Sequence, residues 1–138
     1  MRNVKQKNPE RGAALVELAI VLPFLLLILM GTTEVGLLFY NQQVLTNASR
    51  EGARSGITHT TESEIIAVVE NYCMDRLITF GTMPVINTVV NGEGGSYATD
   101  LTVTVSYAYT FLVPELLGLG TSKQLEAETI MSMERTLL

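Results

Sequence analysis

Residues that commonly carry out chemistry are scarce in this sequence. It contains a single cysteine, Cys73, and a single histidine, His59. Nucleophilic catalysis of the Cys–His or Ser–His–Asp kind needs a histidine beside the nucleophile, and cysteine or histidine metal sites need several ligands. Cys73 falls on the apolar face of a predicted helix, where a buried structural thiol is expected. We therefore predict no catalytic residue, no enzyme activity and no cofactor.

A second group of candidate ligands surrounds a glycine-rich segment. Glu93 and Asp100 flank the glycines of Asn91-Gly92-Glu93-Gly94-Gly95-Ser96 and offer oxygen atoms to a calcium ion. A calcium loop needs a spaced run of oxygen ligands, which this segment lacks. We interpret it as a hairpin loop with incidental acids and predict no metal site.

The third candidate is a carboxylate inside an apolar run. Sixteen uncharged residues separate Glu17 from Glu34. At a rise of about 1.5 Å per residue they span roughly 24 Å, which is less than a bilayer core of about 30 Å. Adding residues 13–16 makes the span long enough but places Glu17 inside one end of the membrane. A carboxylate there is costly, so we interpret it as functional.

Charge is distributed unevenly along the chain. Four of the nine basic residues and one of the fourteen acidic residues lie in residues 1–12, which gives that segment +3 and the remainder −8. Basic flanks of an apolar span stay in the cytoplasm, so residues 57–138 are expected on the extracytoplasmic side. Because no basic patch follows the first twelve residues, nucleic acid is not expected as a partner.

Apolar periodicity predicts one long helix over residues 13–56, following a leader, residues 1–12, without stable structure. Its first part crosses the membrane and contains Pro23, which should bend it locally. Its second part is amphipathic, and Gly56 is expected to cap its C-terminus.

A small domain over residues 57–138 should follow. Thr61 and Glu64 form a capping box that starts a second helix, which is expected to end near Gly81 and Pro84. Beyond it, β-branched or alternating apolar residues predict three antiparallel strands, in residues 84–90, 100–111 and 125–133. The predicted fold class is therefore α+β, with a long helix, a second helix and a small three-stranded sheet.

The segment Gly12-Ala13-Ala14-Leu15-Val16-Glu17 resembles the processing site of type IV prepilins. In that family a membrane aspartic peptidase cuts after the glycine. The resemblance implies a cleavable leader over residues 1–12, a cut between Gly12 and Ala13, and Glu17 as the fifth residue of the mature chain. The new amino group of Ala13 on a neighbouring subunit could then pair with Glu17 and set the register of assembly. The alternative is an ordinary signal anchor, although this apolar run is longer than usual for a signal peptide and no clear cleavage site follows it.

Further motifs resemble the N-terminal module of TadE-like proteins, the pseudopilins of tight-adherence (Flp) type IV pilus systems. They are Leu22-Pro23, Glu34 with Gly36, Phe39-Tyr40 and Arg50-Glu51-Gly52-Ala53-Arg54. The resemblance implies a minor pilin in the bacterial inner membrane, or incorporated into a pilus. The partners that it implies are a prepilin peptidase, other pilin and pseudopilin subunits, the inner-membrane assembly platform and membrane lipid.

Several residues of these motifs are possible subunit contacts: Glu34, Arg50, Glu51, Gly52 and Arg54. Gly52 permits close approach, and the arginines offer forked donors. The other interpretation is a solvated helix end with a weak ion pair, and for Glu34 a hydrated carboxylate at the lipid interface. At the level of function, the alternative is an anchored extracytoplasmic binding module that does not polymerise; leader cleavage distinguishes the two. A small membrane enzyme is the least supported hypothesis.

Overall fold

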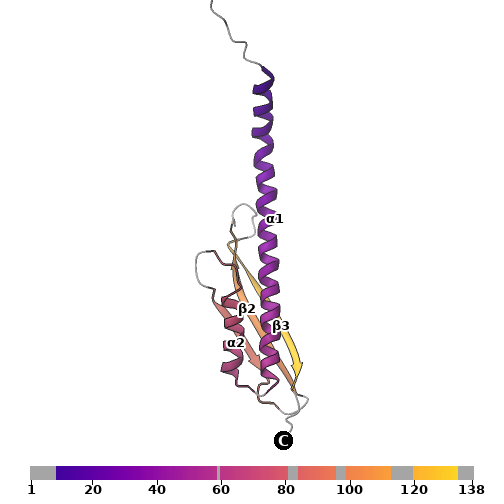
Figure 1. Ribbon diagram of the computed structural model, residues 1–138, viewed down its shortest axis with the longest axis vertical. Coiled ribbons are helices and arrows are strands. Elements are labelled where there is room, and N and C mark those ends of the chain that lie inside the picture. The colour runs from indigo at the N-terminus through magenta and orange to yellow at the C-terminus, as the bar shows by residue number, and fades with distance from the viewer. Residues whose placement is uncertain (1–8, 59, 81–83, 96–98, 113–119, 134–138) are drawn as a thin grey trace, which may run out of the picture.

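The computed structural model describes residues 9–58, 60–80, 84–95, 99–112 and 120–133, with side chains from residue 12 onward (Figure 1). Its elements are α1 (Pro9–Gly56), α2 (Glu62–Met74), β1 (Ile86–Asn91), β2 (Asp100–Thr110) and β3 (Ser122–Ser132). The strands form one antiparallel sheet in the order β1-β2-β3. The predicted α+β fold with three antiparallel strands is confirmed.

Helix α1 is 48 residues long and continues unbroken through Pro23. It begins at Pro9, earlier than predicted, so residues 9–12 of the expected leader are helical and not without structure. Proline is tolerated in the first turn of a helix, where its missing N–H has no intrahelical partner. The prediction for the rest of the leader, residues 1–8, lies outside the described residues.

The two halves of α1 have different surroundings. Residues 12–30 are exposed along their whole length, whereas buried positions recur from Glu34 to Gly56. The most apolar window of 18 residues in α1 has a mean hydropathy of 2.7, and none of it is buried within the chain. By length and composition, α1 can cross a membrane, and Figure 1 shows its N-terminal half projecting alone from the folded domain. A single-pass anchor is compatible with this arrangement.

Both helices cover the same face of the sheet. Helix α1 packs on β2 and β3, while α2 packs beside α1 and over β1. The alternation predicted for the central strand is confirmed, because its apolar side chains are buried beneath the helices: Leu101, Val103, Val105, Tyr107 and Tyr109. From the helices, Leu45, Ala48, Ile65, Val69 and Cys73 complete the core.

Helix α2 begins as predicted and ends early. The Glu64 carboxylate accepts hydrogen bonds from the backbone N–H and the hydroxyl of Thr61, both at 2.9 Å, and these bonds lower the Glu64 pKa. The helix ends at Met74 and not near Gly81. The buried Asn41 side chain explains this difference, because it donates to the Ile78 carbonyl at 2.8 Å and accepts from the Ile78 N–H at 3.0 Å. These bonds hold the chain against α1 in a non-helical path.

Gly56 ends α1, but not by the expected mechanism. The described glycines with positive φ do not include it, so it is not a left-handed cap. A Cβ atom at this position would collide with the side chains of Leu101 and Ile65. The glycine is therefore required by close packing between α1, α2 and β2.

Candidate functional site

Gly12 and Ala13 lie in the first turns of α1 and are exposed. A Cβ atom added to Gly12 would meet nothing within 4 Å. Packing within the chain therefore does not require glycine at this position. Glycine does weaken a helix, by roughly 1 kcal/mol relative to alanine, so the Gly12–Ala13 bond lies where the helix is easier to open.

Glu17 projects from the exposed N-terminal part of α1, residues 12–30, which we call the bare half. It has no hydrogen bond or ion pair within the part of the chain that the structure describes, and its neighbours Ala14, Leu18 and Val21 are apolar. In a lipid environment such a carboxylate needs a donor from outside the chain, or must reach the headgroups. The structure leaves Glu17 available to a partner.

Glu34 has the opposite environment. It is only 2% exposed and turned toward the end of β2. Tyr109 donates its hydroxyl proton to Glu34 Oε1 at 2.7 Å. The backbone N–H of Leu112 donates to both carboxylate oxygens, at 3.1 and 3.0 Å. These bonds connect α1 to residues 75 and 78 positions further along the chain.

The expectation of a hydrated carboxylate at the lipid interface is therefore wrong. The side chain of Glu34 is used inside its own chain, and the bonds that it accepts fix the helix to the sheet. Burial, and then the hydrogen bond and negative charge of Glu34, raise the pKa of Tyr109 far above its usual range. Tyr109 therefore remains a hydrogen-bond donor throughout the physiological pH range.

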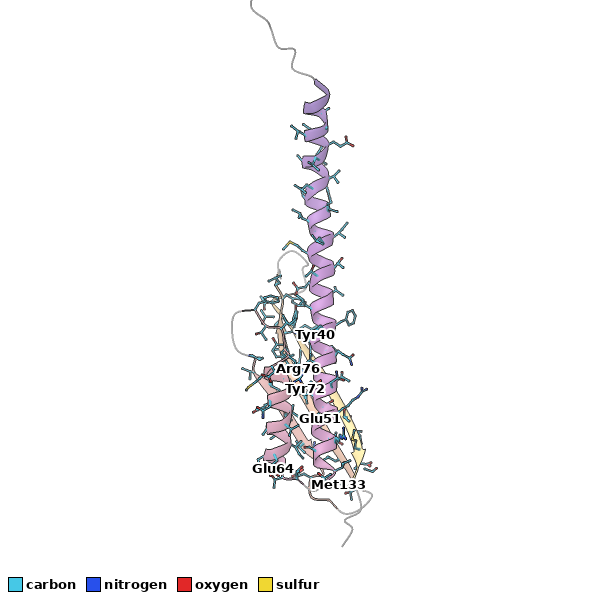
Figure 2. The ribbon with its side chains drawn as sticks, viewed as in Figure 1. Tyr40, Glu51, Glu64, Tyr72, Arg76 and Met133 are labelled. Atoms are coloured by element: carbon cyan, nitrogen blue, oxygen red, sulfur yellow. The ribbon has the colours of Figure 1, made fainter. Side chains whose placement is uncertain are left out.

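The segment Arg50–Arg54 divides between two faces of α1. Arg50, Glu51 and Arg54 are exposed, and their role as subunit contacts stays a prediction (Glu51 is labelled in Figure 2). Gly52 is buried, and a Cβ atom there would press on Val69 of α2. The close approach that Gly52 permits is thus between α1 and α2 of the same chain.

Three positions with structural roles were not singled out as site residues in the sequence. Tyr109 was predicted only as part of the strand over residues 100–111, and Leu112 carried no signal. Their partners are distant in sequence, and four of the five hydrogen bonds to those partners use a backbone group. An amide such as Asn41 at an apolar helix position is a useful hint, because a buried amide needs partners.

In a comparison with known families, residues 12–54 match the model described as TadE-like protein. This N-terminal segment is TadE-like. The match begins at Gly12, ends just before α1 does, and includes Glu17, Glu34 and Gly52. It covers less than half of the chain and leaves out α2 and the sheet. No curated protein and no solved structure matches the chain.

The TadE-like match confirms the resemblance drawn from the sequence motifs and indicates a protein associated with a Tad pilus. TadE-like proteins are structural pilus components and not enzymes, and the family suggests other pilus components as partners. Among the described residues, no three His, Cys, Asp or Glu side chains are grouped to hold a metal ion. Cys73 is buried, and burial raises its pKa to about 11, so it is a poor nucleophile.

Proposed function

We propose that this chain is a minor pilin or pseudopilin that a prepilin peptidase cuts between Gly12 and Ala13. One observation carries the proposal: the TadE-like segment, residues 12–54, is part of one continuous helix in which residues 12–30, including Gly12 and Glu17, are exposed and the residues from Glu34 onward support a folded domain. Such a helix can stay in the bilayer and later pack against the helices of other subunits. Its partners would be the peptidase, other pilin subunits and the inner-membrane assembly platform.

Leader cleavage can be tested with two glycines of the same helix. Gly12 and Gly36 are both on α1, and a Cβ atom at either would meet nothing within 4 Å. Gly12→Leu should block processing and leave the uncut chain in the membrane, whereas Gly36→Leu should be processed normally. Intact mass and N-terminal sequencing of the membrane-extracted protein give the result. A wild-type N-terminus other than Ala13 would contradict the proposal and favour an anchored module that does not polymerise.

Within this function, Glu17 is proposed to act in assembly, not in folding or cleavage. Its exposed carboxylate has only apolar neighbours within its own chain. Cleavage would create a positive amino group at Ala13, and the amino group of an adjacent subunit could pair with Glu17 and set the axial register. A charge pair in a dry site requires good geometry, so its main effect would be specificity of register.

The Glu17 role has its own experiment. Glu17→Ala should be inserted and cleaved normally, but should fail to crosslink to pilin partners and fail to support piliation. Glu17→Asp should be intermediate, because the shorter side chain reaches less far. Glu62→Ala is a control that removes an exposed carboxylate from α2, outside the proposed subunit contacts. Wild-type piliation by Glu17→Ala would show that the carboxylate is incidental.

A further inference from the structure

Four large apolar side chains are exposed at one level of the molecule, where α1 enters the folded domain. They are Val35 (48% exposed), Phe39 (67%), Tyr40 (46%) and Leu112 (46%). Leu112 lies at the same level as these residues of α1, because its backbone N–H donates hydrogen bonds to the Glu34 carboxylate. Figure 2 shows Tyr40 on α1 beside the end of the domain from which the bare helix projects. We call these four residues the collar.

We propose that the collar lies in the lipid headgroup layer, so that the folded domain rests on the membrane and is not held clear of it. The proposal requires that α1 cross a bilayer, but it does not depend on cleavage or on a pilus. It assigns a membrane-contacting surface to the folded domain in addition to the anchor itself.

Distances along α1 give the depth of the collar. A hydrocarbon core of about 30 Å that begins near Ala14 ends near Thr33. The headgroup layer adds roughly 5–7 Å on each side, and Val35 to Tyr40 covers about 8 Å of helix. Counted from Thr33, Val35 lies about 3 Å and Tyr40 about 10 Å further along the helix. The collar therefore begins in the headgroup layer and ends just beyond it, in the zone where aromatic side chains with an apolar body and a polar edge are favoured.

The burial of Glu34 removes the main objection to this depth. In the sequence, Glu34 is the only charged residue of α1 between Glu17 and Arg50. An exposed carboxylate at this position would resist contact with lipid. Because Tyr109 and Leu112 bind it inside the chain, the surface of α1 from Leu18 to Tyr40 presents no charge to the membrane.

A lysine beside the collar adds charge complementarity. Lys123 is exposed and, with Phe39, Val35 and Phe111, lines a groove of about 340 Å³. A cation next to aromatic side chains at headgroup depth suits lipid phosphates. Isolated exposed apolar residues such as Ile130 are common and need no partner, but a group of them joined to a membrane-crossing helix indicates lipid contact.

The absence of tryptophan from the sequence makes the test direct. Single variants Phe39→Trp and Leu112→Trp report on the collar, and Ile130→Trp is the matched control on β3. Ile130 is similarly exposed, at 57%, and belongs to the last residues of β3. Figure 1 shows that this end of β3 is far from the N-terminal half of α1. The full chain is placed in vesicles of phosphatidylcholine with some phosphatidylglycerol, and each tryptophan is quenched by aqueous acrylamide or by lipids with a nitroxide near the headgroup.

Compared with Ile130→Trp, we expect the tryptophan emission of Phe39→Trp and Leu112→Trp to be blue-shifted and to be quenched more strongly by the lipid nitroxide. Their acrylamide quenching constants should be several-fold smaller than that of Ile130→Trp. Circular dichroism checks that all three variants keep the fold. Two results would overturn the proposal. Equal acrylamide quenching at the three positions would mean that the collar is in water and open to a protein partner. Protection that disappears as the protein is diluted with lipid would mean that a second copy of the chain covers the collar.

Discussion

The buried hydrogen bonds of Glu34 allow us to predict how much stability the domain loses when they are removed. Glu34 accepts from the Tyr109 hydroxyl and the Leu112 N–H at a site that is only 2% exposed. Hydrogen bonds to charged groups contribute roughly 1.5–3 kcal/mol each, and removing the acceptor leaves both donors unsatisfied. We therefore expect Glu34→Ala to lower the free energy of unfolding of the domain by roughly 3–5 kcal/mol. Tyr109→Phe should lower it by about 1.5–3 kcal/mol, because the bond from Leu112 remains.

A double-mutant cycle tests the assignment. If the Tyr109–Glu34 bond is the source of the loss, Tyr109→Phe should cost little once Glu34 is alanine, which gives a coupling energy of about 1.5–3 kcal/mol. Tyr107→Phe is the control, because Tyr107 is on the same strand and its hydroxyl makes no hydrogen bond among the described residues. Unfolding of the full chain in detergent is followed by near-ultraviolet circular dichroism, and exchange of the Leu112 amide by NMR. Independent, additive losses together with unchanged Leu112 protection would refute the reasoning.

Three further predictions follow from the packing, the pKa shifts and the charge pattern. Gly52→Ala should destabilise the domain by about 1–2 kcal/mol, because the added Cβ overpacks against Val69. Gly36→Ala should not destabilise it, because a Cβ there meets nothing within 4 Å, and thermal unfolding of the two variants tests the difference. Burial raises the pKa of Cys73 to about 11 and raises that of Tyr109 further. The free energy of unfolding of the domain should therefore be constant below about pH 9 and fall as the pH rises through 11, because the unfolded chain loses these protons first. In unfolding curves measured at increasing pH, Cys73→Ala should show a smaller fall. Protease added to spheroplasts should digest residues 57–138, and digestion only after lysis would reverse the predicted topology.

Local patterns account for most of the predicted fold. The sheet could be predicted because β2 alternates apolar and polar residues over its whole length, and the start of α2 because Thr61 and Glu64 are three residues apart. The end of α2 could not be predicted, because it depends on Asn41, 37 positions away from Ile78. The role of Gly56 was also missed, since sequence alone cannot distinguish a glycine needed for its φ angle from one needed for close packing.

The same limit applies to the candidate site. A motif can indicate that Glu34 matters, but not whether its partner belongs to the same chain or to another. The answer depends on Tyr109, which follows it by 75 positions, and on a backbone N–H, which has no sequence signature. The exposed charges of Arg50, Glu51 and Arg54 show the reverse case. They make no side-chain hydrogen bond or ion pair with another described residue, and their contacts with other subunits stay a prediction.

Glu17 and Glu34 show how one helix can hold two carboxylates with different roles. A carboxylate near lipid requires hydrogen-bond donors, and the chain supplies them to Glu34 from β2 and the residues that follow it. Among the described residues it supplies none to Glu17, around which it places only apolar side chains. Internal donors make Glu34 a fixed part of the fold and allow the domain to approach the membrane. In the proposed function, the missing donors leave Glu17 dependent on lipid headgroups while the chain is alone, and on another subunit after assembly. Replacing Glu34 should therefore disturb the fold first, whereas replacing Glu17 should disturb only assembly.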